Sequence, residues 1–141
     1  GVLANGVMGS WMTRLTDDSE ITQLCVEAES VSGLTETLFL RYLTRLPTDA
    51  ERETFHALLS DGFENRVIPE ADRAPAPKKE RMPYVSWSNH LHSEANSIKQ
   101  KEEAKARAGD PPTRFLKTQW REQAEDALWA LLNAPEMIMV P

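Results

Sequence analysis

The stretch WREQAEDALWALLNAPEMIMVP, from Trp120 to Pro141, decides the fold of this chain. Its residues Trp120, Ala124, Ala127, Leu128 and Leu131 follow the i, i+4, i+7, i+8, i+11 spacing of one helical face. Thr118 is placed to cap this helix, and Asn133 with Pro135 ends it, because proline lacks the amide hydrogen that continues a helix. From residue 127 to 132 the helix is apolar all round, which predicts burial on more than one side.

Upstream of this helix, residues 33–62 predict a helical hairpin. Its first helix can be capped by Ser32 and stops before Pro47, since the residue before a proline disfavours helical geometry. Thr48 then opens a Thr-x-x-Glu capping box, in which two side chains satisfy free backbone amides at the start of the second helix. Gly62 is placed to end that helix. The short connection between the two helices predicts antiparallel neighbours.

The segment before the hairpin predicts another short helix that starts near Asp17 and Glu20, whose carboxylates suit the positive end of a helix dipole. Cys25 is the single cysteine of the chain and lies within an apolar stripe of this helix. One thiol cannot form an internal disulfide and cannot build a zinc site alone. We therefore expect Cys25 to be a small buried residue rather than a reactive thiol.

Length and composition limit the classes of protein to which the chain can belong. At 141 residues it has the size of one domain, and with 40% apolar and 27% charged residues it is globular. The net charge of -6 argues against binding of duplex nucleic acid, which normally requires a basic surface. No apolar run approaches the roughly 20 residues that a membrane-spanning helix needs, so we expect no membrane span.

The middle of the chain differs from its two ends. Residues 63–92 are rich in proline and predict a long loop of extended character. Residues 93–109 contain mostly helix-forming and charged residues, with few apolar ones, and predict a charged helical arm. Residues 1–62 then supply the N-terminal helices, and 110–141 the C-terminal helix and tail, all in one domain or a fragment of one.

These segments predict an all-α fold. We expect four or five helices in a small orthogonal or bundle-like array, with the proline-rich loop and the charged arm extending from it.

Two histidines offer the nearest approach to a chemical site. His90 and His92 are two residues apart, so on an extended segment their imidazoles can point the same way and bind a metal, with Glu94 as a third ligand. The alternative is a polar turn that leads into the charged helix, with Asn89 or Ser93 as its cap. His56, the third histidine, is expected at the surface of the hairpin or at the boundary of its core. The sequence contains no complete catalytic motif, so it leaves open whether the chain is an enzyme.

A small basic and aromatic cluster precedes the histidines. Lys78, Lys79 and Arg81 are followed by Tyr84 and Trp87. Such a cluster can bind an anionic polymer or an acidic partner surface, and its aromatic rings can stack on sugars or bases. The alternative is a solvated loop, which is the usual fate of a short basic run in an acidic chain.

Three blocks of the sequence carry a family resemblance. They are LFLRYLTRLPTDAERE (38–53), the segment beginning YVSWSNHLHSEAN and ending GDPPT (84–113), and the closing 120–141 stretch. Together they resemble the C-terminal end of a planctomycete-type domain of unknown function, the PSD family. The pattern LxLRxLxRxPTxxE matches from Leu38 to Glu51. The pattern EDxLWALLNSPEF begins at Glu125, with Ala134 in place of the usual Ser and Met137 in place of the usual Phe.

The resemblance implies that the chain is the tail of a larger exported, multidomain protein, and therefore extracytoplasmic. Upstream domains of the same protein would be its partners. Many members of the family include a cytochrome-c-like domain, so a haem is expected only in a separate domain, and no cofactor in this chain. The leading hypothesis is a non-catalytic structural or interaction module. The alternative is that the region of His90 and His92 contributes to a metal-dependent or polysaccharide-acting site completed by upstream residues.

Overall fold

The computed structural model describes residues 12–78 and 94–135, and the chain divides into two compact units. The first unit comprises residues 1–73 and 112–141, and the second comprises residues 74–111. In the described ranges the regular elements are helices, and the one pairing of extended backbone is an isolated antiparallel bridge. The prediction of an all-α fold with four or five helices is confirmed, since the described residues form five α-helices.

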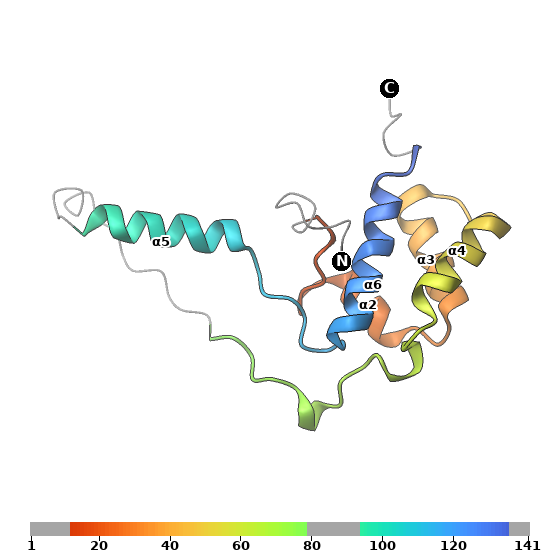
Figure 1. Cartoon of the computed structure of the whole chain (residues 1–141), viewed down its shortest axis with the longest axis horizontal. Coiled ribbons are helices and arrows are strands. Elements are labelled where there is room, and N and C mark those ends of the chain that lie inside the picture. The colour runs from red at the N-terminus through yellow and green to blue at the C-terminus, as the bar shows by residue number, and fades with distance from the viewer. Residues whose placement is uncertain (1–11, 79–93, 136–141) are drawn as a thin grey trace. The chain divides into compact units, whose positions relative to one another are not determined.

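The described part of the first unit contains the helices α2 (Glu20–Glu27), α3 (Val31–Leu43), α4 (Asp49–Leu59) and α6 (Thr118–Leu132). Helices α3, α4 and α6 pack against one another in all three pairings, and Figure 1 shows α6 lying alongside the α3–α4 hairpin. Phe39 of α3 and Phe55 of α4 meet edge to face, with ring centroids 5.0 Å apart. Each fully buried side chain of this size contributes about 1.5–3 kcal/mol of hydrophobic stabilisation.

The starts of α3 and α4 are fixed by side-chain caps. Ser30 caps α3, because its Oγ accepts a hydrogen bond from the amide of Gly33 at 3.1 Å. The prediction of Ser32 as the cap is wrong by two residues, and Ser32 lies inside the first turn. At α4 the predicted capping box is present. Thr48 Oγ1 accepts from the Glu51 amide at 3.3 Å, and a Glu51 carboxylate oxygen accepts from the Thr48 amide at 2.7 Å.

Two other helix boundaries differ from the sequence prediction by a few residues. Helix α4 ends at Leu59 rather than at Gly62, which instead forms a left-handed turn with φ of 76° that leads into the 3-10 helix η1 (Phe63–Asn65). Thr118 is the first residue of α6 and not its cap. Lys117 occupies the cap position without a side-chain bond to the helix.

The inward face of α6 is the one that the spacing predicted, with Trp120, Ala124, Ala127, Leu128 and Leu131 all buried. The indole Nε1 of Trp120 donates to the Leu59 carbonyl at 2.9 Å, and its ring meets Phe63 edge-on with centroids 6.0 Å apart. The prediction that α6 is buried on more than one side is wrong. Ala130 is exposed and Trp129 is only partly buried, because they lie on the face of α6 opposite the one that packs on α3 and α4.

The segment before α2 is attached to the segment before α6 through Asp17. Its Oδ1 accepts from Thr113 Oγ1 at 2.8 Å and from the Arg114 amide at 3.0 Å, and its Oδ2 accepts from Arg114 Nε at 2.7 Å. Burial alone raises the pKa of Asp17, but the hydrogen bonds from Arg114 and Thr113 outweigh it and hold that pKa below its ordinary value. The Asp17 carboxylate thus binds the segment before α6, while the helix predicted to start near Asp17 and Glu20 begins at Glu20, with Ser19 in the cap position without a side-chain bond.

An antiparallel contact joins the two chain segments that border the second unit. Val67 and Leu116 form the isolated bridge, and the Ile68 amide donates to the Phe115 carbonyl at 2.8 Å. Close by, the Lys117 amide donates to the carbonyl of residue 66 at 2.8 Å. The first unit therefore pairs its outgoing and returning segments before residue 74 and after residue 111.

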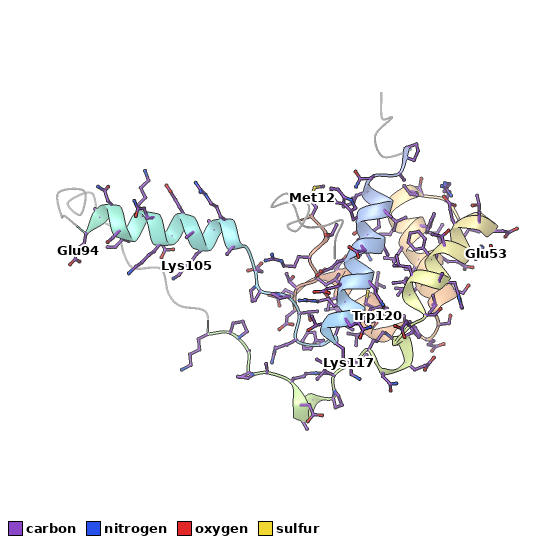
Figure 2. The ribbon with its side chains drawn as sticks, viewed as in Figure 1. Met12, Glu53, Glu94, Lys105, Lys117 and Trp120 are labelled. Carbon is purple, nitrogen blue, oxygen red and sulfur yellow. The ribbon has the colours of Figure 1, made fainter. Side chains whose placement is uncertain are left out.

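The described part of the second unit is dominated by α5 (Ala95–Ala108), the predicted charged helix. It has no buried residue, and Figure 2 shows its side chains extending on all sides. Ion pairs join Lys99 to Glu103 at 3.9 Å and Lys105 to Glu102 at 3.6 Å. Of the predicted proline-rich loop, residues 63–78 are described and contain only the short helices η1 and η2 (Glu70–Asp72), while 79–92 lie outside the described residues.

Candidate interaction surface

Two open grooves flank the first half of α3. One, of about 330 Å³, lies between α3 and α4 and is called here the α3–α4 groove. The other, of about 370 Å³, lies between the end of α2 and α3 and is called the α2–α3 groove. Volumes near the lower end of the range for ligand pockets have room for one or two side chains of a partner.

The α3–α4 groove has a mostly apolar wall and a polar rim. Val31 and Ala57 line it together with Thr35, whose hydroxyl donates to the Val31 carbonyl at 2.8 Å and so presents its methyl group with no free donor. On the rim, Arg52 of α4 forms an ion pair with Glu36 of α3. The groove therefore suits an apolar side chain of another polypeptide, with charged residues of the rim around it.

His56 lies on the same rim and is exposed, as the sequence predicted. Its Nδ1 is 3.0 Å from the hydroxyl of Ser60, one turn further along α4. That hydroxyl also donates to the His56 carbonyl. Ser60 is thus engaged with the backbone at the end of the helix, which is a capping role rather than that of a nucleophile.

The α2–α3 groove combines an apolar floor with an acidic rim. Leu24, Ala28 and Leu34 line it and belong to the apolar core or pack against it. Glu27, the last residue of α2, and Glu29, in the connection to α3, also line it, and both are exposed. A partner side chain in this groove therefore meets hydrocarbon beneath and negative charge beside it.

Arg66 fixes the end of α2 at this groove. Its guanidinium donates to four carbonyls: Cys25 at 2.6 Å, Val26 at 3.1 Å, Ala28 at 2.5 Å and Phe63 at 2.8 Å. Three of these carbonyls belong to the last turn of α2 and its cap, where a helix leaves acceptors unsatisfied. The side chain of Arg66 thus holds the end of α2 and the position of Ala28, which lines the groove.

The surroundings of Arg66 favour this arrangement. The residue is only 6% exposed, and its guanidinium lies 3.9 Å from the centroid of Phe63 and 5.6 Å from that of Trp120. Burial lowers the pKa of Arg66, yet an arginine stays charged in proteins, so a cation faces the negative end of the α2 dipole. The aromatic rings add cation–π attraction to the four hydrogen bonds.

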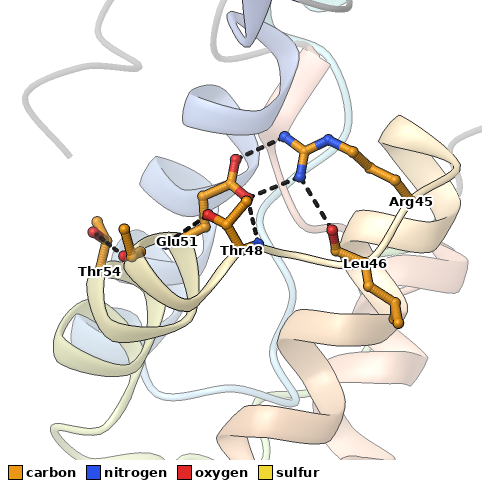
Figure 3. Close-up of polar contacts among 6 residues, drawn as sticks. Arg45, Leu46, Thr48, Glu51 and Thr54 are labelled. Atoms are coloured by element: carbon orange, nitrogen blue, oxygen red, sulfur yellow. Dashed lines mark hydrogen bonds and ion pairs between the residues drawn. The ribbon is translucent and has the colours of Figure 1, made fainter.

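A second arginine fixes α4 relative to the end of α3 (Figure 3). Arg45 binds the Glu51 carboxylate with both terminal nitrogens, at 2.7 and 2.8 Å, and also donates to the Leu46 carbonyl at 3.1 Å. The hydrogen bonds from Arg45, reinforced by those from Thr48, lower the pKa of Glu51 to about 2. The capping box and the ion pair therefore share one carboxylate.

The prediction for Cys25 is confirmed. The residue is 1% exposed, and burial raises the pKa of its thiol to about 12. A thiol with this pKa is protonated at neutral pH and is a poor nucleophile. Cys25 is therefore a buried residue of the hydrophobic core.

Most residues of the two sites predicted from the sequence lie outside the described residues. Of the metal-site candidates, Glu94 is exposed and occupies the cap position of α5 without a side-chain bond to the helix, whereas His90 and His92 are not described. Of the ligand-binding candidates, Lys78 is exposed, and Lys79, Arg81, Tyr84 and Trp87 are not described. Within residues 12–78 and 94–135 no group of three His, Cys, Asp or Glu side chains is arranged to hold a metal.

The histidine site thus remains a prediction. Metal analysis of the purified protein and of a variant with His90→Ala and His92→Ala tests it, and equal metal content in the two would remove the idea.

Sequence reasoning did not find the two grooves or Arg66. Residue 66 stands in a stretch that the prolines and charges marked as loop, and nothing in its spacing distinguishes it from other surface arginines. The one available signal was its position between the apolar residues Phe63 and Val67, which both join the core.

Comparison with protein-family models, with curated proteins and with solved structures finds no match to this chain. Among the described residues, no helix has the length and apolar character that crossing a membrane requires.

Proposed function

We propose that this chain is a non-catalytic interaction module, which holds a neighbouring polypeptide against the grooves beside α3. In the larger exported protein that the family resemblance implies, this polypeptide belongs to the upstream domains. Enzymatic or redox chemistry, including any haem, then resides in those domains.

The two grooves carry this proposal. Each opens at the surface and has apolar side chains in its wall, and each is lined by a helix whose end is held by an arginine, Arg66 for α2 and Arg45 for α4. Pockets that bind ligands are concave and mostly apolar, and the backbone of most protein interfaces moves little on binding. Exposed apolar side chains are otherwise few in the described residues, namely Met12, Leu40 and Leu46 among the large ones.

Hydrogen exchange tests the proposal. Amide exchange in residues 24–37 and 52–57 is compared between the isolated chain and the longer protein in which it resides. We expect exchange in both segments to slow in the longer protein, because a docked partner suppresses local opening of the helices that it covers. Residues 95–108 of α5 serve as the internal control. Equal exchange at 24–37 and 52–57 in the two proteins would count against the proposal.

A matched pair of variants locates the effect. Ala57→Gln places a longer side chain in the α3–α4 groove, whereas Ala50→Gln changes another exposed alanine of α4 that does not line it. We expect Ala57→Gln, and not Ala50→Gln, to restore fast exchange at 52–57 in the longer protein. Restoration by both variants would point to a general loosening of α4 instead.

A further inference from the structure

Some acidic residues of the first unit form ion pairs with arginines, and others are exposed without one. Asp17, Glu20, Glu36, Glu51 and Glu125 belong to the first kind. Glu27 and Glu29, at the rim of the α2–α3 groove, are exposed and make no ion pair or side-chain hydrogen bond with any residue of the described ranges. Two exposed carboxylates that form no ion pair in the described ranges therefore lie beside one apolar floor.

Helix stability does not explain Glu27. It lies in the last turn of α2, which contains no basic residue of its own, and the cation at this helix end, Arg66, is occupied by backbone carbonyls. Within the described residues Glu27 gains no ion pair or side-chain hydrogen bond from this position. Residues that do not serve the fold of their own helix are candidates for binding.

The charge of the whole unit acts in the same direction. Residues 1–73 and 112–141 contain nine Lys and Arg against seventeen Asp and Glu, a net charge of -8, whereas residues 74–111 contain seven against five, a net charge of +2. The groove therefore belongs to the acidic part of the chain, and its field attracts cations and repels phosphates and acidic surfaces.

We propose that the α2–α3 groove binds a segment of a protein partner in which a large apolar side chain is flanked by Lys or Arg. The apolar side chain contacts Leu24, Ala28 and Leu34, and the flanking cations pair with Glu27 and Glu29. This inference rests on the proposed role as an interaction module and adds the face that is used and the chemistry of what it takes.

The probe for the test is a short fluorescein-labelled peptide of alternating Lys and Leu, and its binding is followed by fluorescence anisotropy. We expect Glu27→Gln with Glu29→Gln to weaken binding about fivefold at low salt, and the effect to shrink as salt is raised, because exposed ion pairs are screened. The matched control is Glu70→Gln with Asp72→Asn, which removes the same charge at the same spacing from the exposed helix η2. It should leave binding unchanged within about twofold.

A second probe, with every Leu replaced by Ser and the charges kept, separates the floor from the rim. We expect this probe to bind at least about tenfold more weakly, because the apolar contact is lost. Equal binding of both probes would show that only charge matters, and an equal loss in the two double variants would show that the position of the charge does not matter. Either result would mean non-specific electrostatic attraction and would overturn the inference. So would concentration-dependent self-association abolished by the Glu27 and Glu29 changes, since the occupant would then be a second copy of this chain.

The outcome is separable from that of the proposed function. Slowed exchange at 24–37 and 52–57 in the longer protein, together with failure of the peptide test, would retain the module and discard the basic partner. Unchanged exchange would discard the module whatever the peptides do.

Discussion

At the scale of single residues, Arg66 takes the place of a local cap. Helix α2 has no basic residue in its last turn, and the cation that binds its end comes from about forty residues further along the chain. Because the same guanidinium also binds the Phe63 carbonyl, one side chain joins the end of α2 to η1. A long-range contact thus performs a task that is usually local.

We expect Arg66→Lys to lower the free energy of unfolding by about 3 kcal/mol, since an ammonium keeps the charge but cannot reach four carbonyls with a planar fork. Urea denaturation followed by circular dichroism measures the change. Arg41→Lys is the control, because Arg41 is exposed and pairs with the exposed Glu20. It should cost less than about 0.5 kcal/mol, and a similar loss in both variants would contradict the role of Arg66.

Glu51 makes stability depend on pH at the acid end. The folded-state pKa of about 2 lies below the ordinary 4.5, so the contribution is complete above pH 4.5 and is lost as the pH falls through about 2. We expect Glu51→Gln to cost about 1 kcal/mol at neutral pH, a value reduced for solvent screening, and next to nothing at pH near 2. Urea titrations across this range measure it. Glu53→Gln, at an exposed neighbouring position, should show no such crossover.

These residues also show where sequence reasoning succeeds. The Thr48–Glu51 box was predictable because its partners are three residues apart and the geometry is that of any helix start. The Arg45 bond to the same carboxylate was not, because it depends on how the turn through Pro47 folds back. The choice between Ser30 and Ser32 depends equally on the backbone conformation and not on residue type.

At the scale of elements, α6 completes the core that the α3–α4 hairpin begins. Its attachment to α4 is polar as well as apolar, since the Trp120 indole donates to the carbonyl of the last residue of α4. The periodicity of α6 predicted its inward face in full. It did not predict the outer face, because apolar character says which residues can be buried and not which neighbours exist to bury them.

Replacement of the two tryptophans of α6 tests this attachment. We expect Trp120→Phe to lower the free energy of unfolding by about 2 kcal/mol, because the buried Leu59 carbonyl loses its donor and the smaller ring leaves a gap. Trp129→Phe, in the same helix but partly exposed, should cost less than about 1 kcal/mol. Urea denaturation compares the two, and a larger loss for Trp129→Phe would show that the outer face of α6 matters more.

At the scale of the whole molecule, the chain divides into the first unit, which contains the hydrophobic core, and the second unit, residues 74–111, which is called here the excursion. The bridge between Val67 and Leu116 pairs the two segments that border residues 74–111. Arg73 adds to this pairing, because its Nε donates to the Ile68 carbonyl at 2.9 Å and its guanidinium lies 4.9 Å from the ring of Phe115. A loop whose ends are already paired contributes little to the stability of the unit that pairs them.

We therefore expect the first unit to fold without its excursion. Replacement of residues 74–111 by a Gly-Ser linker of about ten residues should leave the melting temperature within about 4 °C of that of the full chain. Circular dichroism measures the transition. The same replacement combined with Leu116→Ala, which opens the buried side of the bridge, should lower the melting temperature clearly. Loss of cooperative unfolding in the simple replacement would show that the excursion is part of the core.

The burial of Cys25 makes its thiol a natural probe of local unfolding of α2. With the thiol 1% exposed and its pKa near 12, alkylating reagents react with it only in molecules whose α2 has left the core. Since it is the single cysteine of the sequence, each modified molecule records one such event without any engineered label. The rate of modification at neutral pH thus measures how often α2 opens. Because α2 supplies Leu24 and Glu27 to the α2–α3 groove, a ligand that occupies the groove should slow the modification in proportion to its occupancy.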